Sequence, residues 1–434
     1  MNFRSLSFWS VGLFLLLYFF HFYLVWKYAV NVPFYDEWEL FRSGGMESHT
    51  LRWLLTPHYE HLIIPTKVEN WALFHLAGWN LRFEILLNFG IFGLLLATVV
   101  RVARRIDPGL PLWAVLAFVI FLLNTAPAET HLWGFQSQYH FAPLFKLLSI
   151  LVLFHPSQGW KPAVGGALLL AASLASYSAG AAACLVVLPV YLAYKLPTVW
   201  RSSGIDRRRQ LLQLLCAATI VGGALAYWWS WQIIRLPAFI HPGQGRFWLL
   251  FFRMVGWGFG LTTPSPYPGF VLFCVAILIP LAWILLTQWR ERDARFWILI
   301  LCVATTLSEL GAIVYGRGYI DYDPVIERYV EVAFFLIPWS VYLWASALRE
   351  RIIARNAVLG LLWVFCAITV GSSIFRFRYD EIEDWRLKSI ACLKGYYKNG
   401  GEARCPQAHP SPLKLDLDRA RELQLSFYRE MMEK

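Results

Sequence analysis

Carboxylates gather in the first polar stretch of the chain. The segment FYDEWE at positions 34–39 places three carboxylates within four residues, between aromatic side chains and shortly after a long apolar run. A carboxylate that is partly desolvated near a bilayer has a raised pKa, which suits a general base, and carboxylate oxygens also suit a divalent cation. Both chemistries are therefore predicted for Asp36 and Glu37, with a solvated acidic loop as the alternative.

A second polar group, HYEH, occupies positions 58–61 of the same stretch. Glu60 and His61 are predicted to hydrogen-bond a polar substrate. The spacing differs from the HExxH arrangement that places two histidines on one zinc ion, so a zinc site is not the favoured interpretation. The alternative is a pair of interfacial histidines whose hydrogen bonds are satisfied by neighbouring groups.

A third group, ETHLWGFQSQYH at positions 129–140, mixes aromatic rings with amides and imidazoles. Such a surface suits a sugar, because rings cover its apolar face and amides bond its hydroxyl groups. Trp133, Gln136 and Gln138 are the candidate sugar-binding residues. An aromatic belt at the membrane interface is the alternative, and it accounts for the tryptophan but not for the two glutamines.

The candidate phosphate-binding residues are cations further along the chain. Arg317 and Arg328, the latter followed by Tyr329, flank a short polar segment, and guanidinium groups hold phosphate in a bidentate manner. Pairing with nearby acidic residues is the alternative. Lys146 lies in an apolar run, where a charge needs a partner. That partner is either an anionic headgroup or Glu309, which lies in another apolar run.

The elements that must position these groups are membrane helices. Of the 434 residues, 58% are hydrophobic and 15% are charged, whereas a soluble domain carries about 25% charge. Much of the apolar content falls in runs near the length that spans a bilayer, and such runs must be helical to satisfy their backbone groups. The predicted fold is therefore an all-α, polytopic transmembrane helical bundle, whose partner is the lipid bilayer.

Charge in the short loops sets the expected topology. The net charge of +11 reflects basic loops between apolar runs, so no nucleic-acid partner is expected. With those loops in the cytoplasm, about eleven spans result, the N-terminus lies inside and the C-terminus outside. The predicted units are a membrane domain, 1–375, and an extracytoplasmic tail, 376–434. The first extracytoplasmic loop, 31–82, is expected to carry short amphipathic helices, and the run 247–261 to form an interfacial or re-entrant helix.

The tail carries two further expectations. Cys392 and Cys405 lie thirteen residues apart on the oxidising side, where a disulfide is plausible. The run Leu413–Met432 has the apolar spacing of an amphipathic helix that packs on the outer face. Whether the tail binds an acceptor or braces the loops is left open.

Taken together, these motifs resemble the GT-C superfamily of membrane glycosyltransferases, and in particular bacterial members with a YDEW-type first loop. The resemblance rests on YDEW at 35–38, HYEH at 58–61, WGFQ at 133–136 and the late Arg328–Tyr329, and it covers most of the membrane portion. It implies a polyprenyl-phosphate-linked sugar donor and a glycan or lipid acceptor. It also implies a bacterial inner membrane location with the active site on the extracytoplasmic face.

The resemblance also implies roles for individual residues. Asp36 would deprotonate the acceptor hydroxyl, and Glu37 would assist it or bind a metal. Arg317 or Arg328, together with Lys146, would hold the donor phosphate and stabilise the leaving group, with inversion by direct attack. Some superfamily members use a divalent cation such as Mg²⁺ or Mn²⁺, for which Asp36 would be the ligand. The sequence departs from the usual pattern at Tyr59, where similar proteins often carry asparagine, and at residue 327, where serine is common.

Three other functions compete with this interpretation. A transporter or flippase for lipid-linked glycans predicts charged or broken helices near the bilayer midplane, and few are evident. A ligase or polymerase of surface polysaccharide shares the donor chemistry, but its key loop would normally be late and basic. A structural membrane subunit is the remaining alternative.

Overall fold

A computed structural model describes residues 3–48, 50–110, 112–156, 159–232, 239–261, 263–288, 293–317, 329–374, 378–399 and 404–433. These residues fold as helices and connecting turns, with no strand among them. The expected all-α architecture is therefore confirmed.

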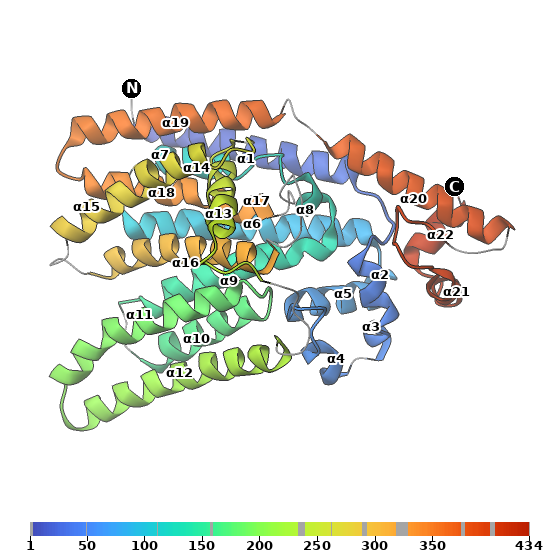
Figure 1. The fold of residues 1–434 in the computed structure, drawn as a ribbon, viewed down its shortest axis with the longest axis horizontal. Coiled ribbons are helices and arrows are strands. Elements are labelled where there is room, and N and C mark those ends of the chain that lie inside the picture. Colours follow the sequence, from blue (N-terminus) through green and yellow to red (C-terminus); the bar gives the residue numbers. More distant parts are fainter. Residues whose placement is uncertain are drawn as a thin grey trace.

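Helices running side by side form the body of the molecule (Figure 1). They are α1 (Phe3–Tyr28), α6 (Leu81–Ile106), α7 (Leu112–Phe121), α9 (Ser137–Leu153), α10 (Trp160–Leu174), α11 (Gly180–Arg201), α12 (Gly204–Gln232), the continuous α14 (Tyr267–Leu272), η2 (Phe273–Leu278) and α15 (Ile279–Thr287), α16 (Ala294–Arg317), α17 (Val330–Phe334), α18 (Leu336–Ala347) and α19 (Ile352–Ile374). Figure 1 shows α13 (Gly245–Gly258), which covers most of the run 247–261, crossing the direction of its neighbours.

Eight helical segments of the described chain are long and apolar enough to cross a membrane, so the chain is a multi-pass membrane protein. Three other runs that were expected to cross coincide with the shorter helices α7, α9 and α10, which have 10, 17 and 15 residues. The described helices therefore do not confirm the count of eleven spans.

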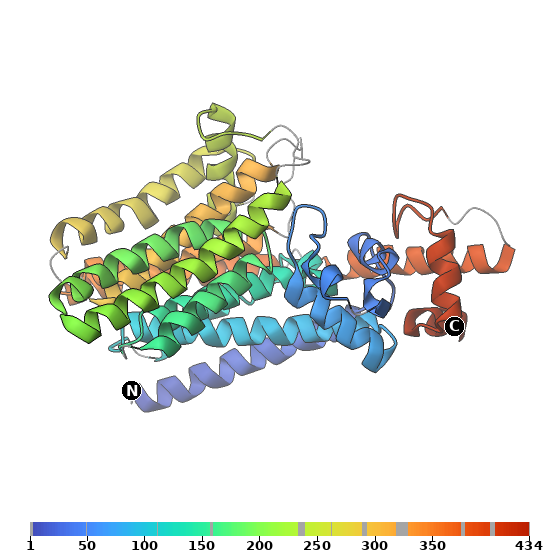
Figure 2. The ribbon, with the colours of Figure 1, turned by 90° about the horizontal axis from the view of Figure 1, so that it is seen from below.

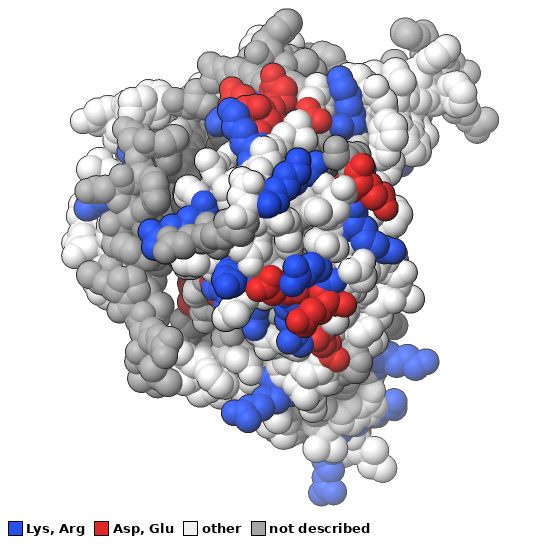
Figure 3. All heavy atoms as spheres, turned by 90° about the vertical axis from the view of Figure 1, so that its right-hand side faces the viewer, with Lys and Arg blue, Asp and Glu red and all other residues white. Residues whose placement is uncertain are grey.

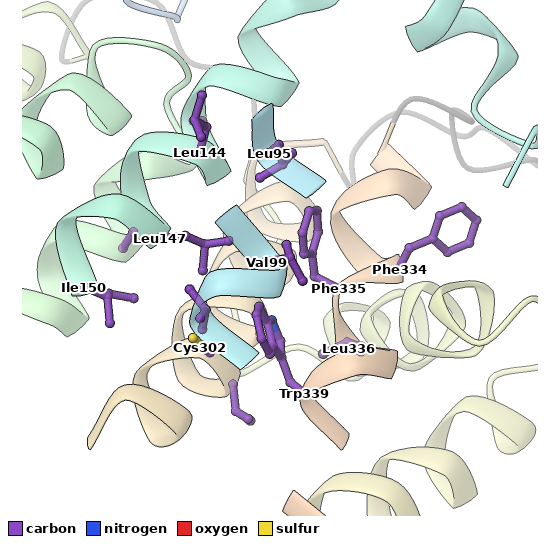
Figure 4. Close-up of a cluster of buried hydrophobic side chains, with 14 of the residues drawn as sticks. Leu95, Val99, Leu144, Leu147, Ile150, Cys302, Phe334, Phe335, Leu336 and Trp339 are labelled. Carbon is purple, nitrogen blue, oxygen red and sulfur yellow. The ribbon is translucent and has the colours of Figure 1, made fainter. Parts of the chain in front are cut away.

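The core of the bundle is apolar and closely packed. Figure 4 shows Leu95 and Val99 of α6 meeting Leu147 of α9, Cys302 of α16 and Trp339 of α18, all of them buried. A Lys–Glu ion pair lies inside this bundle. Lys146 of α9 donates to Glu309 of α16, and both side chains are almost fully buried.

The first loop and the tail gather at one end of the bundle (Figures 1 and 2). The loop forms α2 (Asp36–Arg42), α3 (Gly45–Ser48), α4 (Leu51–Leu55) and α5 (Ile64–Ala77), and the tail forms α20 (Tyr379–Asn399), α21 (Lys414–Glu422) and α22 (Ser426–Glu433). We call this group the outer layer. Figure 1 shows the turns between α11 and α12 and between α18 and α19 at the opposite end, and arginines lie in or close beside both turns.

The outer layer has a hydrophobic core of its own, to which the loop and the tail both contribute. Trp38, Phe41 and Trp79 from the loop pack with Leu417 and Phe427 from the tail. Burying large rings from both segments gives a reason for them to fold together. The tail is therefore integrated with the first loop.

Polar contacts reinforce this union, and a disulfide cross-links the tail itself. The disulfide expected between Cys392 and Cys405 is present, with sulfur atoms 2.07 Å apart. The Tyr35 N–H donates to the Ala408 carbonyl at 2.9 Å, and Arg42 pairs with Asp416 at 2.7 Å. The tail thus braces the loop at the residue next to Asp36.

The single amphipathic helix expected over Leu413–Met432 is wrong, because the structure divides it into α21 and α22. Gln424 takes a positive φ of 49° between them. The Leu425 N–H donates to the Ala420 carbonyl and the Gln424 N–H to the Arg421 carbonyl, which is the Schellman arrangement that ends a helix. The turn lets Leu425 and Phe427 both enter the core of the outer layer.

The buried pair in the bundle predicts a strongly non-additive double-mutant cycle. Glu309→Met alone leaves the Lys146 ammonium without its carboxylate, and Lys146→Met alone leaves the carboxylate without its cation. Each should destabilise the protein by about 3–5 kcal/mol, whereas the double variant should lie close to the wild type. Thermal unfolding in detergent measures all four proteins. A double variant that loses the sum of the two single losses would contradict the pairing.

Candidate functional site

The two adjacent carboxylates at the start of α2 have different environments. Asp36 is partly exposed, whereas Glu37 is 1% exposed. The Glu37 carboxylate accepts the Phe34 N–H at 2.7 Å and the Phe135 N–H at 3.4 Å, and it lies 4.0 Å from the Arg386 guanidinium. Glu37 therefore ties the first loop to two distant segments, and Asp36 is left at the surface.

Burial dominates the titration of Glu37. It raises the pKa of this carboxyl to about 7, although Arg386 and the two backbone N–H groups act in the opposite direction. Arg386 itself is 4% exposed, lies 4.1 Å from the centre of the Phe34 ring and donates to the Val32 and Leu132 carbonyls. Burial lowers the pKa of Arg386, and Glu37 opposes that shift.

The HYEH segment forms a tight turn. The His58 N–H donates to the His61 carbonyl at 2.8 Å, and the His61 N–H donates back to the His58 carbonyl at 3.0 Å. Tyr59 has a φ of 51°, a backbone conformation that residues other than glycine and asparagine rarely adopt. An asparagine at this position would fit this backbone with less strain.

Side chains of the turn contact the other predicted motifs. The His58 ring lies 5.2 Å from the Phe135 ring, and burial lowers the pKa of His58 to about 3. The exposed Tyr59 interacts electrostatically with Asp36 and Glu39. Partial burial and these two carboxylates raise the pKa of the phenol, and Arg42 opposes them.

On the other side of the turn, Glu60 and His61 meet the end of α16. Arg317 donates to the Glu60 carboxylate and to His61 Nε2, the latter at 3.1 Å. The His61 ring lies 4.7 Å from the Tyr177 ring. The Tyr139 ring lies 4.8 Å from the Tyr177 ring and 5.9 Å from the Tyr329 ring, so Tyr329 belongs to the same group of aromatic rings.

The predicted sugar-binding residues are buried in the structure. Trp133 is 2% exposed, Gln136 1% and Gln138 4%. The Trp133 ring packs against Phe34, and the Gln138 amide donates to Gln136 at 3.4 Å. These three side chains are therefore buried near the YDEW segment rather than displayed on an open surface.

The predicted phosphate-binding cations are dispersed. Arg317 lies at the outer end of α16, whereas Lys146 is held by Glu309 inside the bundle. The structure therefore does not bring Lys146 to the outer layer. Arg328 lies outside the described residues.

Among the described residues, Asp36 is not joined by the other ligands of a metal site. Glu37 is engaged by backbone N–H groups and Arg386, and Glu39 pairs with Arg42 at 2.8 Å and His409 at 3.0 Å. Within the described parts of the chain, the one group of three potential ligands that lies close together excludes Asp36. We therefore assign no cation to Asp36.

A pocket of about 330 Å³ opens next to the YDEW segment. The rings of Phe34 and Trp385 line it together with charged side chains that include Glu129, Arg378 and Asp384. Trp385 is 42% exposed and lies 6.3 Å from the Tyr35 ring. Figure 3, which views the outer end of the molecule, shows charges of both signs across this face.

Sequence reasoning missed several buried charges of the site. Arg386 gave no signal, because it is one of many charges in the polar tail. Lys67 is 2% exposed and donates to the Trp53 and Thr56 carbonyls at 2.7 and 2.5 Å. Glu69 is 7% exposed, and the Ser137 side chain partly offsets the effect of burial on the pKa of its carboxyl. Lys67 and Glu69 follow the HYEH segment so closely that their charge could have marked α5 as part of the site.

No protein-family model and no curated protein matches the chain. The assignment of a function therefore rests on the chemistry and the geometry of the outer layer.

Glu69 predicts a pH dependence of stability. Burial raises the pKa of this carboxyl from 4.5 to about 8. The folded state thus retains a proton that the unfolded state releases. This contribution to stability is complete below pH 4.5 and is lost as the pH rises to about 8. Glu69→Gln removes the contribution. The melting temperature of the variant minus that of the wild type should therefore be larger at pH 8.5 than at pH 5.5.

Differential scanning fluorimetry in detergent at the two pH values checks this expectation. Glu422→Gln, a substitution at an exposed glutamate of α21, is the matched control and should shift equally at both pH values. A Glu69→Gln difference that does not change with pH would contradict the raised pKa.

Proposed function

We propose that the chain is a membrane glycosyltransferase of the GT-C type. It would move a sugar from a polyprenyl-phosphate donor to a glycan or lipid acceptor of the cell envelope. The observation that carries the proposal is the separation of two adjacent carboxylates, with Asp36 partly exposed and Glu37 buried and engaged. Adjacent carboxylates in unlike environments are a common basis for dividing catalytic roles.

In this proposal Asp36 is the general base. It accepts the proton of the acceptor hydroxyl as the oxygen attacks the anomeric carbon, and the bond from that carbon to the donor phosphate breaks. One base suffices for direct displacement with inversion. Glu37 is a positioning residue, because its two oxygens hold the backbone N–H groups of Phe34, just before the YDEW segment, and of Phe135 in the WGFQ segment.

Backbone strain supports this location. Four residues other than glycine have a positive φ in the described chain, and Tyr35 and Tyr59 are two of them. Tyr35 immediately precedes Asp36, and Tyr59 interacts with it. Strained backbone of this kind persists where the surroundings enforce it, and it concentrates at functional sites.

Arg317 is the proposed phosphate ligand. Its guanidinium is paired with Glu60 and His61 in the structure. A donor phosphate would compete with the Glu60 carboxylate for the same N–H groups. Arg328 stays a proposed second ligand. Tyr329, the next residue in the sequence, lies beside the Tyr139 ring. We assign Lys146 a structural role, because Glu309 pairs with it inside the bundle.

The sugar is proposed to lie against exposed rings near Asp36. Trp385 in the pocket and Tyr59 on the turn are more accessible than Trp133, which supports a platform built from these two rings. Gln136 and Gln138 then shape the wall beneath. In the proposed topology eleven crossings place the outer layer on the extracytoplasmic face of a bacterial inner membrane, and the arginine-rich turns face the cytoplasm.

A flippase for lipid-linked glycans is the second candidate, because Lys146 and Glu309 form a charged pair inside the bundle. That function would require the pair for transport and would tolerate a neutral residue at position 36. The two proposals therefore differ in which variant abolishes activity.

The decisive experiment measures sugar transfer by purified protein. A panel of polyprenyl-phosphate sugars serves as donors, and an envelope extract supplies the acceptors. Asp36→Asn should lower kcat by about 10²–10⁴-fold with little change in donor KM, since it removes the base and retains the shape. Asp36→Glu should recover part of the rate.

Asp380→Asn, the same substitution at an exposed position of α20, is the control and should transfer sugar like the wild type. Near-normal transfer by Asp36→Asn would reject Asp36 as the base. Loss of lipid-linked glycan transport in Lys146→Met/Glu309→Met, with transport intact in Asp36→Asn, would favour the flippase.

A further inference from the structure

A buried group of potential metal ligands lies where the outer layer meets the bundle. His131 of α8 (Ala128–Leu132), His140 of α9 and Glu331 of α17 are 1%, 0% and 4% exposed. One ligand atom from each lies within 4.8 Å of the other two. None of these residues belongs to the proposed catalytic apparatus.

Neighbouring side chains fix the orientation of His140. The Asn88 amide N–H₂ donates to the Thr130 and Trp133 carbonyls, so its oxygen is the atom that faces His140 Nδ1, at 2.5 Å. Nδ1 must then donate, which leaves Nε2 directed at Glu331 Oε1, 2.8 Å away. A metal ion bound to His140 Nε2 and the Glu331 carboxylate would take the place of this contact.

His131 has a similar arrangement. Its Nδ1 lies 2.7 Å from the Tyr379 hydroxyl, which also lies 2.5 Å from His21 Nε2. When the His131 Nδ1–H donates to the Tyr379 oxygen, the Tyr379 hydroxyl proton is donated to His21. His131 Nε2 then carries a lone pair. A histidine whose second nitrogen is oriented in this way is the usual form of a metal ligand.

Two atoms of the group lack hydrogen-bond partners in the described chain. They are His131 Nε2 and Glu331 Oε2, and both are buried. A buried polar atom without a partner costs free energy, and native structures rarely leave one unsatisfied. Two such atoms in one small group point to a ligand that satisfies both.

We propose that His131, His140 and Glu331 bind a divalent transition-metal ion of the zinc class. Two imidazoles and one carboxylate form a ligand set typical of zinc, with a fourth position for water. Zinc ligands lie roughly 3.4 Å apart when each is about 2.1 Å from the metal. The ligand atoms lie within 4.8 Å of one another, and His140 Nε2 and Glu331 Oε1 are 2.8 Å apart, so binding needs only small side-chain adjustments. Magnesium is disfavoured, because it prefers oxygen ligands.

The metal would join α8 and α9 to α17, which lies far from them along the chain. Asn88 of α6 orients His140, and Tyr379 of α20 orients His131, each through the Nδ1 atom of the histidine. Leu132, next to His131, accepts a hydrogen bond from Arg386. The site therefore anchors the segment that supports Arg386 and Glu37. It does not depend on the proposed transferase activity.

Metal retention by purified protein tests the proposal. Protein with a tag free of histidine is stripped by chelating resin, incubated with zinc chloride and desalted, and its zinc is measured by plasma mass spectrometry. The wild type should retain about one zinc per chain, because three protein ligands and water complete the site. His140→Gln and Glu331→Gln should each lose it, whereas His241→Gln, at an exposed histidine, should retain it.

A second measurement guards against variants that fail to fold. Cobalt added to the wild type should give the visible absorption of a low-coordinate site, and zinc should abolish that absorption. Tyr379→Phe, which preserves the ring, should weaken zinc binding by about 10–100-fold. Folded wild type that retains no zinc and gives no cobalt spectrum would overturn the proposal. Equal retention in the wild type, His140→Gln and Glu331→Gln would overturn it as well.

Discussion

The geometry of the outer layer depends on the four-residue turn His58–His61. Its paired backbone hydrogen bonds fix the directions of four consecutive side chains. His58 faces the WGFQ segment, Tyr59 faces the YDEW segment, and Glu60 and His61 face Arg317. Motifs that are separated by up to 280 residues therefore meet around one turn. A positive φ at Tyr59 is the backbone cost of this arrangement, on the order of 1 kcal/mol.

Helical geometry separates the two carboxylates that follow Tyr35. Successive residues of a helix point about 100° apart, so Asp36 and Glu37 cannot both face the core. Glu37 takes the inward direction, where Phe34, Phe135 and Arg386 surround it. The electrostatic cost of burying Glu37 appears in its raised pKa. The same contacts prevent α2 from rotating, and this constraint determines where Asp36 lies.

Much of the architecture could be predicted from the sequence, because membrane spans and basic loops are local signals. The helical bundle, the grouping of the first loop with the tail at one end and the Cys392–Cys405 disulfide are of this kind. The partners of individual charges are not local. Arg386 lies 349 positions beyond Glu37 in the sequence, and nothing in the polar tail distinguishes it from its neighbours. The burial of Trp133 and Gln136 likewise depends on how α8 and η1 (Gly134–Gln136) fold back against the YDEW segment.

The tail is best understood as part of the structure that supports Asp36. It contributes Arg386 to Glu37, the Ala408 carbonyl to Tyr35, and Leu417 and Phe427 to the shared core. Tyr35 has a strained backbone, and the hydrogen bond to Ala408 is one of the contacts that hold it. A chain without the tail would lose the cation beside a buried carboxylate, and the cost of leaving Glu37 unpaired would fall on the segment that carries Asp36. The C-terminal residues are therefore coupled energetically to the first loop.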